Sequence, residues 1–384
     1  MKEGYTLIIT EKPTAASRIA KALDQNGKPK TLKLGTIPYF LSKNSKNIVV
    51  ISALGHLYTV TQEGEGRDFY PVFDFKWTPR YEVERSAGKI KDWIDAISKL
   101  SEGADDFINS CDYDVEGSLI GYMILKYACG GKEEHAKRMK FSTLTRKEIL
   151  EAYKNVSPKL DFPLVYAGRT RHEVDWLYGI NLSRALTLSA KRWSGKYSTL
   201  STGRVQGPTL KFLYDREREI RSFVPTPYWE VKAKVEVKGK ILDVEYERDK
   251  ILKRDEADRI VNACRGKSGK VIEIETRDFK VPPPTPFDLG TLQTEAYRLF
   301  RYTPRRSLDL AERLYLEALI SYPRTSSQKL PPAINYREIL NGLSQVPAYT
   351  KLTSLLLYMD ELRPNEGKKD DPAHPAIYPT GNMP

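Results

Sequence analysis

Three carboxylates stand at alternate positions directly after an apolar stretch of the sequence, and their spacing is typical of a cation site. They are Asp112, Asp114 and Glu116, which we call the acidic cluster. Two unit charges about 4 Å apart repel by roughly 4 kcal/mol at an effective dielectric of about 20, so a buried cluster needs a counter-charge. Mg²⁺ is a hard cation that binds carboxylate oxygens. The pattern therefore predicts a magnesium site, with a solvated acidic turn as the alternative.

A fourth carboxylate follows another apolar stretch. Glu11 comes directly after Leu7–Thr10, and Lys12 is the next residue. Reactive groups in parallel sheets lie at the carboxyl ends of the strands. If the stretches that precede Glu11 and Asp112 are neighbouring strands, Glu11 joins the acidic cluster at one edge of the sheet. We then expect it to share the metal.

Tyr322 is the candidate nucleophile among 23 tyrosines. Arg324 lies two residues further on, and a cation near a phenol favours the phenolate and neutralises charge that builds up on a phosphoryl group. With Pro323 between them in a strand-like segment, the two side chains are expected on one face. The alternative for Tyr322 is packing in the core.

The elements that must position these groups alternate between strand and helix over roughly the first 145 residues. Apolar β-branched runs predict strands, and apolar residues at helical spacing predict helices. The strands are predicted at Tyr5–Thr10, Asn47–Ala53 and Asp106–Cys111, and the helices at Pro13–Leu23, Ile90–Leu100 and Leu119–Tyr127. The alternation predicts an α/β domain, with a parallel sheet covered by helices.

The pattern changes twice after Thr145. Helices are predicted at Lys147–Asn155, Leu164–Lys191 and Arg204–Arg221, antiparallel strands at Tyr228–Val237, Ile241–Glu247 and Lys270–Lys280, a rigid connection at Pro282–Pro286, and further helices from Asp288. We therefore predict four domains. They are an α/β domain at 1–147, a helical domain at 148–222, a β-rich segment at 223–286 and a helical domain with Tyr322 at 287–384.

The composition excludes several classes of protein. Lys and Arg number 62 and Asp and Glu 50, a net charge of +12 that favours a polyanionic partner, although charged surfaces also occur in heat-adapted proteins. No run of 18 apolar residues and no signal-peptide pattern is present, so we expect no membrane association and a cytoplasmic location. The three cysteines lack metal-site spacing, and no P-loop supports the use of ATP.

Several motifs resemble one family. The acidic cluster with Glu11 resembles the Toprim domain of topoisomerases, primases and some nucleases. Tyr-x-Arg-Thr-x-Ser at 322–327 resembles the active-site motif of type IA DNA topoisomerases. Further blocks resemble the same family in the same order, at Arg171–Asn181, Leu200–Pro208 and Ala373–Thr380. The residues at Glu11–Pro13 and Asp175–Tyr178 resemble the topoisomerase III or archaeal branch. The resemblance as a whole implies a multidomain type IA core.

The resemblance implies an enzyme that cleaves one DNA strand through a 5′-phosphotyrosine link at Tyr322, passes a strand and religates, which relaxes negative supercoils. Arg324 and Lys12 would stabilise the transition state. Glu11 would act as general acid, with a pKa raised by its carboxylate neighbours. The acidic cluster would hold Mg²⁺, mainly for religation. Contacts with a single DNA strand are implied at Arg171, Asp175, Ser201, Arg204, Gln206 and His374.

Two alternatives and two departures from the family stay open. A Toprim nuclease or primase would use the carboxylates without a tyrosine, and an inactive strand-binding fragment would need a C-terminal partner. Val115 and His172 stand where bacterial members often have arginine. Family members continue after Ala373–Thr380, which implies that this chain is incomplete or that a second polypeptide supplies the rest. We then expect Tyr322 to be held poorly against Glu11.

Overall fold

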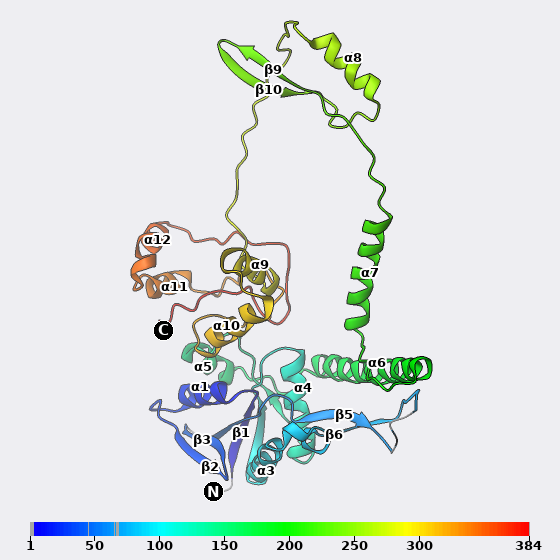
Figure 1. Cartoon of the computed structure of the whole chain (residues 1–384). Coiled ribbons are helices and arrows are strands. Elements are labelled where there is room, and N and C mark those ends of the chain that lie inside the picture. Colours follow the sequence, from blue (N-terminus) through cyan, green and yellow to red (C-terminus); the bar gives the residue numbers. More distant parts are fainter. Residues whose placement is uncertain (1–3, 45, 65, 67–68, 384) are drawn as a thin grey trace. The chain divides into compact units, whose positions relative to one another are not determined.

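The described chain divides into two compact units (Figure 1). This computed structural model describes residues 4–44, 46–64, 66 and 69–383. The first unit contains the residues up to Gly203 together with those from Pro282 onward, and the second unit is Arg204–Val281. The Toprim-like region and the segment around Tyr322 therefore share one unit. The division into four domains stays a prediction.

The first unit is built on a six-stranded sheet in the order β2-β3-β4-β1-β7-β8. The strands are β1 Tyr5–Thr10, β2 Lys30–Leu34, β3 Ile37–Lys43, β4 Asn47–Ser52, β7 Ala104–Asn109 and β8 Lys137–Arg138. The central strand β1 pairs in parallel with both β4 and β7, and β3 pairs antiparallel with β4. The predicted neighbourhood of the strands before Glu11 and Asp112 is confirmed, and an antiparallel hairpin extends one edge of the parallel sheet.

Alternate residues of β1 face two separate apolar layers. Leu7 and Ile9 pack in a cluster with Trp93 of helix α3, whereas Ile8 packs with Ile19 of helix α1. Successive side chains of a strand point to opposite faces, so a strand buried on both sides reads as an apolar run. The helices on the two faces are α1 Pro13–Leu23 and α5 Arg146–Lys154 on one, and α3 Ile90–Ser101 and α4 Val115–Met123 on the other. The predicted sheet covered by helices is confirmed.

Helix α6, Phe162–Ser194, packs against α4 at a glycine. A Cβ atom on Gly168 would lie 2.8 Å from the main-chain oxygen of Val115, so a larger residue would push the two helices apart. Strands β5 (Tyr58–Gln62) and β6 (Phe75–Pro79) form a short antiparallel pair. Strand β5 also contacts α6. The helix predicted at Leu119–Tyr127 is present in two parts. Its first part belongs to α4, and a π-helix follows directly at Ile124–Ala128.

The rest of the first unit is helical. It contains α9 Leu289–Phe300, α10 Pro304–Leu316, α11 Tyr336–Leu343 and α12 Pro347–Leu357. Asp288 begins α9 with a capping box, because its carboxylate accepts from the Thr291 amide at 2.7 Å and the Thr291 hydroxyl accepts from the Asp288 amide at 3.0 Å. The predicted restart of helices from Asp288 is confirmed. Among the described residues, no helix is long and apolar enough to cross a membrane.

The second unit contains α7 Gln206–Ser222, a hairpin of β9 Lys232–Val237 and β10 Lys240–Glu245, and α8 Arg254–Cys264. Two of the three predicted antiparallel strands are confirmed in the hairpin. The prediction of a third strand at Lys270–Lys280 is wrong, since this segment has no regular structure. Its apolar side chains, such as Ile272 and Ile274, are more than four-fifths exposed. β9 and β10 form a sheet of two strands that residues 270–280 do not join. The alternating apolar and polar residues at 270–280 therefore have neither a partner strand nor a core to pack against.

Candidate active site

Register in the sheet brings Glu11 to the acidic cluster. Ile9 of β1 pairs with Asn109 of β7, and the Ser110 amide donates to the Ile9 carbonyl at 2.7 Å. Glu11 and Asp112 therefore leave the same sheet edge together. Burial and, after it, the charge of Asp112 raise the pKa of Glu11 to about 8, against an opposing effect of Lys12. The expected rise is present, but burial contributes more than the neighbouring charge.

Asp114 serves as the N-cap of α4. Its Oδ1 accepts a hydrogen bond from the Gly117 amide at 2.7 Å, which is the usual role of an aspartate at this position. A Cβ atom on Gly117 would lie 2.2 Å from the main-chain oxygen of Asp112, so only glycine fits here. The helix start thus fixes the backbone that carries the two aspartates.

Arg138 supplies a counter-charge that the sequence analysis missed. Its guanidinium is buried and donates to the carbonyl oxygens of Cys111 and Asp112 at 2.8 Å each, and to that of Asn109 at 3.0 Å. A buried cation that binds main-chain oxygens holds the acidic loop in place. Arg138 lies outside every element that the sequence predicted, so no local pattern singled it out.

Lys12 lies between two carboxylates. Its Nζ is 3.0 Å from Oδ2 of Asp112 and 3.5 Å from Oε1 of Glu11. Burial alone would lower the pKa of Lys12, but Asp112 and Glu11 raise it above its usual range. The ammonium group is therefore charged at neutral pH, between the carboxylates of Asp112 and Glu11.

Tyr322 contacts the acidic cluster directly. Its hydroxyl donates to Oδ2 of Asp114 at 2.6 Å, and its amide donates to the Ser142 carbonyl at 2.8 Å. The ring is buried against Tyr315, whose hydroxyl donates to Oδ1 of Asp112 at 3.2 Å. The expectation that Tyr322 is held poorly against Glu11 and the aspartates is wrong, because its segment packs in the core of the first unit.

The environment keeps the Tyr322 phenol protonated. Burial raises its pKa well above the usual range, and Asp112 and Asp114 raise it further. Arg324 instead binds Glu312, with Nε and Oε1 2.8 Å apart, and its side chain is about half exposed while Tyr322 is buried. The expectation that Arg324 shifts Tyr322 toward phenolate is therefore wrong, since burial and two carboxylates outweigh one arginine that already has a partner. The shared face of Arg324 and Tyr322 stays a prediction, and both Tyr322 and Asp114 act electrostatically on Arg324.

Glu116 contacts two histidines and an arginine. Its Oε2 lies 2.8 Å from Nε2 of His56 and 2.9 Å from Nε2 of His172, and its Oε1 lies 3.3 Å from Nη1 of Arg171. Hydrogen bonds from His172 and His56 lower the pKa of Glu116. The role of Glu116 in holding Mg²⁺ stays a prediction, and His56 is a further residue that the sequence analysis did not single out.

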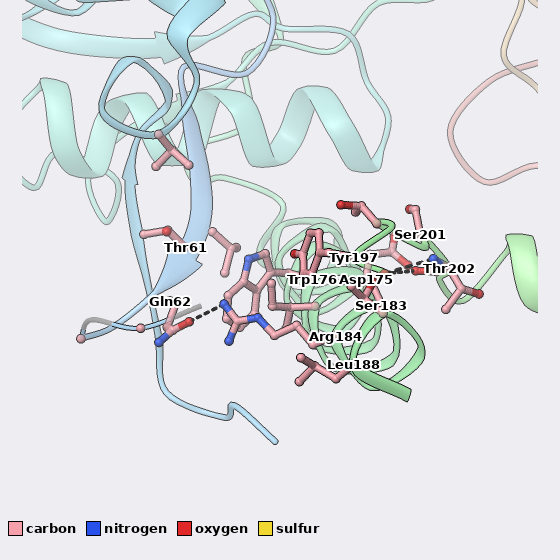
Figure 2. Close-up of a pocket in the computed structure, with 18 residues that line it drawn as sticks. Thr61, Gln62, Asp175, Trp176, Ser183, Arg184, Leu188, Tyr197, Ser201 and Thr202 are labelled. Carbon is pink, nitrogen blue, oxygen red and sulfur yellow. Dashed lines mark hydrogen bonds between the residues drawn. The ribbon is translucent and has the colours of Figure 1, made fainter. Parts of the chain in front are cut away.

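A pocket of about 830 Å³ lies between β5, α6 and residues 197–202 (Figure 2). Asp175 and Ser201, two of the predicted strand contacts, line it together with Trp176. In Figure 2, Arg184 reaches from α6 to Gln62, with Nη2 and Oε1 2.8 Å apart. The pocket combines an aromatic ring with hydrogen-bonding groups, a lining that suits an unpaired base.

The remaining predicted strand contacts lie elsewhere. Arg171 is one helical turn from Asp175, with Nε and Oδ2 3.9 Å apart, and its side chain is more than half exposed. Arg204 and Gln206 belong to the second unit. His374 is buried beside Tyr322, with ring centroids 4.6 Å apart, and its Nδ1 lies 3.0 Å from the Ser142 hydroxyl. Burial lowers the pKa of His374.

The fold and the pairing of a tyrosine with Toprim carboxylates define a protein of the topoisomerase class. The Toprim domain family matches residues 6–144, and the family described as DNA topoisomerase matches residues 159–384. The chain therefore belongs to the DNA topoisomerases, in the type IA class that its motifs indicate. The identification made from the motifs is confirmed.

Relatives include two archaeal proteins named DNA topoisomerase 1. The one from Pyrococcus horikoshii is 49% identical over 381 residues, which are 98% of this chain and 55% of the relative. The one from Methanothermobacter thermautotrophicus is 43% identical over 382 residues, 99% of this chain and 52% of the relative. The chain spans about half the length of these relatives.

A solved structure shares the fold. Full-length topoisomerase I from Thermotoga maritima superposes with a TM-score of 0.60 at 24% sequence identity, over 97% of this chain and 55% of that one. This likeness concerns the fold alone.

Proposed function

We propose that this chain carries the strand-cleaving centre of an ATP-independent type IA DNA topoisomerase. It would cleave one strand of DNA through a 5′-phosphotyrosine link, allow a strand to pass and religate the break, which relaxes negative supercoils. The observation that carries the proposal is the 2.6 Å hydrogen bond from the Tyr322 hydroxyl to Asp114, beside Glu11 and Lys12. A nuclease or primase would have no use for a tyrosine at this place.

The cleavage step assigns a role to each group. The Tyr322 oxygen attacks the phosphorus, and its proton passes to Asp114, which already accepts the hydrogen bond. The bond from phosphorus to the 3′-oxygen breaks, and Glu11 gives that oxygen a proton. The raised pKa of Glu11, about 8, supports this role because the carboxyl group is protonated at neutral pH. Lys12 and Arg324 stabilise the negative charge on the phosphoryl oxygens.

The donor set at the sheet edge fits Mg²⁺. Asp112, Asp114 and Glu11 offer carboxylate oxygens, the ligands that this hard cation prefers. Burial first, and then repulsion from Asp112 and Asp114, raise the pKa of Glu11, and that repulsion supports a place for a cation. Asp112 and Asp114 would hold the ion with Glu11, and Glu116 would join them only after leaving its histidine partners. When bound, Mg²⁺ would supply positive charge next to the phosphoryl group during religation.

Strand binding would use α6 and the pocket beside it. Arg171 and Asp175 lie on α6, and Ser201 lines the pocket, so one unpaired strand could follow this helix toward Tyr322. His374 would contact the strand next to the tyrosine. Arg204 and Gln206, in the second unit, would also bind DNA, and the net charge of +12 favours a polyanion.

A covalent adduct tests the proposal. The chain is mixed with a single-stranded oligonucleotide labelled at its 5′ or 3′ end, denatured and run on a gel. We expect the 3′-labelled piece to stay on the protein, because the link is to the 5′-phosphate. Tyr322→Phe should abolish the adduct with little change in strand binding, and Tyr358→Phe, at an exposed site, should keep it.

The alternatives give different results in the same assay. Cleavage without any adduct would favour a nuclease, and binding without cleavage would favour an inactive strand-binding fragment that needs a C-terminal partner. An adduct that persists in Tyr322→Phe would contradict the assignment of the nucleophile.

A further inference from the structure

Three side chains from separate elements converge next to the acidic cluster. His56 follows β4, Glu116 lies in the first turn of α4, and His172 lies within α6. Both histidines direct Nε2 at the same oxygen, Oε2 of Glu116, at 2.8 and 2.9 Å. The three ligand atoms lie within 4.8 Å of one another, and in the described part of the chain no other group of three His, Cys, Asp or Glu is so arranged.

We propose that His56, Glu116 and His172 bind a late first-row divalent metal ion such as Zn²⁺, at a site separate from the Mg²⁺ site at Asp112 and Asp114. Two imidazole nitrogens and one carboxylate oxygen suit Zn²⁺, whereas Mg²⁺ prefers oxygen ligands. The three side chains are 23–31% exposed, so water can reach the fourth position of a tetrahedral ion.

The geometry needs only a small adjustment to admit the ion. Bonds of about 2.0–2.2 Å in a tetrahedron place neighbouring ligand atoms about 3.4 Å apart. The contacts from Glu116 to His56 and His172 would therefore lengthen by about half an ångström. The imidazole rings already lie side by side, with centroids 4.7 Å apart, so small side-chain rotations are enough.

The elements that carry the ligands are held close to one another. Gly168 lies one helical turn before His172 and touches the α4 backbone at Val115, which brings His172 to the residue that follows, Glu116. On the other side, Arg80 donates to the main-chain oxygen of His56 at 3.1 Å. A site built on packed helices and an anchored loop is preorganised for a metal ion.

Arg171 carries a positive charge that opposes a cation here. Its Nη1 lies 3.3 Å from Oε1 of Glu116, but its side chain is 56% exposed, and Asp175 lies 3.9 Å from its Nε. An exposed ion pair of this kind is weak, so the ion can take Glu116 while Arg171 turns to Asp175 or to a DNA phosphate. Metal binding would thus also free Arg171 for the strand.

Calorimetric titration of Zn²⁺ tests the site without DNA. The whole chain carries Cys264→Ser, because this exposed thiol could bind Zn²⁺ itself, and excess Mg²⁺ fills the carboxylate site. We expect one Zn²⁺ per chain, and with Co²⁺ the strong visible absorption of a four-coordinate ion. His56→Gln and His172→Gln should each weaken binding by more than about tenfold, since even loss of an outer-shell partner costs 10–100-fold.

Two controls keep the test decisive. His135→Gln, at an exposed histidine outside the group, should bind Zn²⁺ like the parent. His172→Arg should fold normally, as judged by circular dichroism and melting temperature, because an arginine can pair with Glu116, yet it should lose the site. Equal Zn²⁺ binding by the parent and both glutamine variants, or no binding above the Mg²⁺ background, would overturn the proposal. Neither result bears on DNA cleavage.

Discussion

Tyr322 and Asp114 are joined by a hydrogen bond of 2.6 Å although 208 positions separate them in the sequence. Asp114 is fixed by a second hydrogen bond, from the Gly117 amide to its other oxygen, at the start of α4. Tyr322, the proposed nucleophile, is therefore positioned by a helix cap. This relationship joins the acidic segment to the tyrosine segment, and burial beside the carboxylates keeps the phenol protonated by raising its pKa.

Tyr315→Phe tests the hydrogen bond that holds Asp112. The ring stays, but Oδ1 of Asp112 loses the hydroxyl that lies 3.2 Å away. Leaving a buried acceptor unpaired costs about 1–3 kcal/mol, so urea unfolding should show a loss of that size. Adduct formation should slow severalfold while strand binding is kept. Unchanged cleavage would show that Asp112 needs no such support, and Tyr349→Phe, at an exposed tyrosine, serves as the control.

Glu11→Gln tests the general acid. Glutamine has nearly the same shape but cannot give a proton to the 3′-oxygen, and general acid catalysis contributes typically about 10²–10⁴-fold. We expect single-turnover cleavage to slow by a factor in that range, with the affinity for single-stranded DNA unchanged. A substrate with a better leaving group at the scissile bond should recover much of the rate. Equal slowing with both substrates would argue for a structural role.

Removal of Mg²⁺ tests the religation step. Preformed adduct is mixed with a strand that carries a 3′-hydroxyl, with Mg²⁺ or with EDTA, and the rejoined product is measured. We expect rejoining only with Mg²⁺, and a double change of Asp112 and Asp114 to asparagine should abolish it while DNA binding persists. Rejoining that is indifferent to EDTA in the parent chain would contradict the metal site.

Salt dependence tests the strand contact at Arg171. With roughly five phosphate contacts, log K for a single strand should fall against log salt with a slope of about −3.5. Arg171→Ala removes one contact and should make the slope less steep by about 0.7, whereas Lys91→Ala on α3 should leave it unchanged. Fluorescence anisotropy at several salt concentrations measures both. A preference for intact duplex would count against the pocket beside α6.

The free energy of unfolding should depend on pH through the titration of Asp24. Its carboxylate accepts from the amides of Lys43, Asn26 and Lys28 at 2.9–3.0 Å, and these bonds, the one from Lys43 first, lower its pKa below the usual value of about 3.8. A lowered pKa stabilises the folded state above the unfolded value, and this stability is lost as pH falls through the folded value.

Asp24→Asn should therefore unfold about 1–2 kcal/mol more easily at pH 7, and its difference from the parent should shrink below about pH 4. Urea titrations at several pH values measure the free energy of unfolding. Asp95→Asn, at an exposed position on α3, is the matched control. A difference that is constant from pH 3 to pH 7 would contradict the role of the charge.

Local patterns in the sequence were enough to find β1, β4 and β7 with helices α1, α3 and α6, but they did not find β2, β3, β5, β6 or β8. β1 and α1 begin and end where the apolar runs and Pro13 predict, and β7 and α6 differ from prediction by only a few residues. Periodicity, caps and apolar runs act over a few residues, so they can be read directly from the chain. The strand prediction at 270–280 failed for the same reason. Alternation of apolar and polar residues is a local pattern, and it does not show whether a partner strand is present.

The sequence by itself determined the family and the sheet edge at which Glu11 meets Asp112, and it singled out Tyr322 as the candidate nucleophile. Only the tertiary structure decided which partner each charge takes. Glu116 pairs with His56 and His172, and Arg324 pairs with Glu312. The buried Arg138 donates to the main-chain oxygen of Asp112. These choices depend on burial and on partners that lie 12 to 60 positions apart in the sequence. The strength of a charge interaction is set by its surroundings in space, which spacing along the chain does not encode.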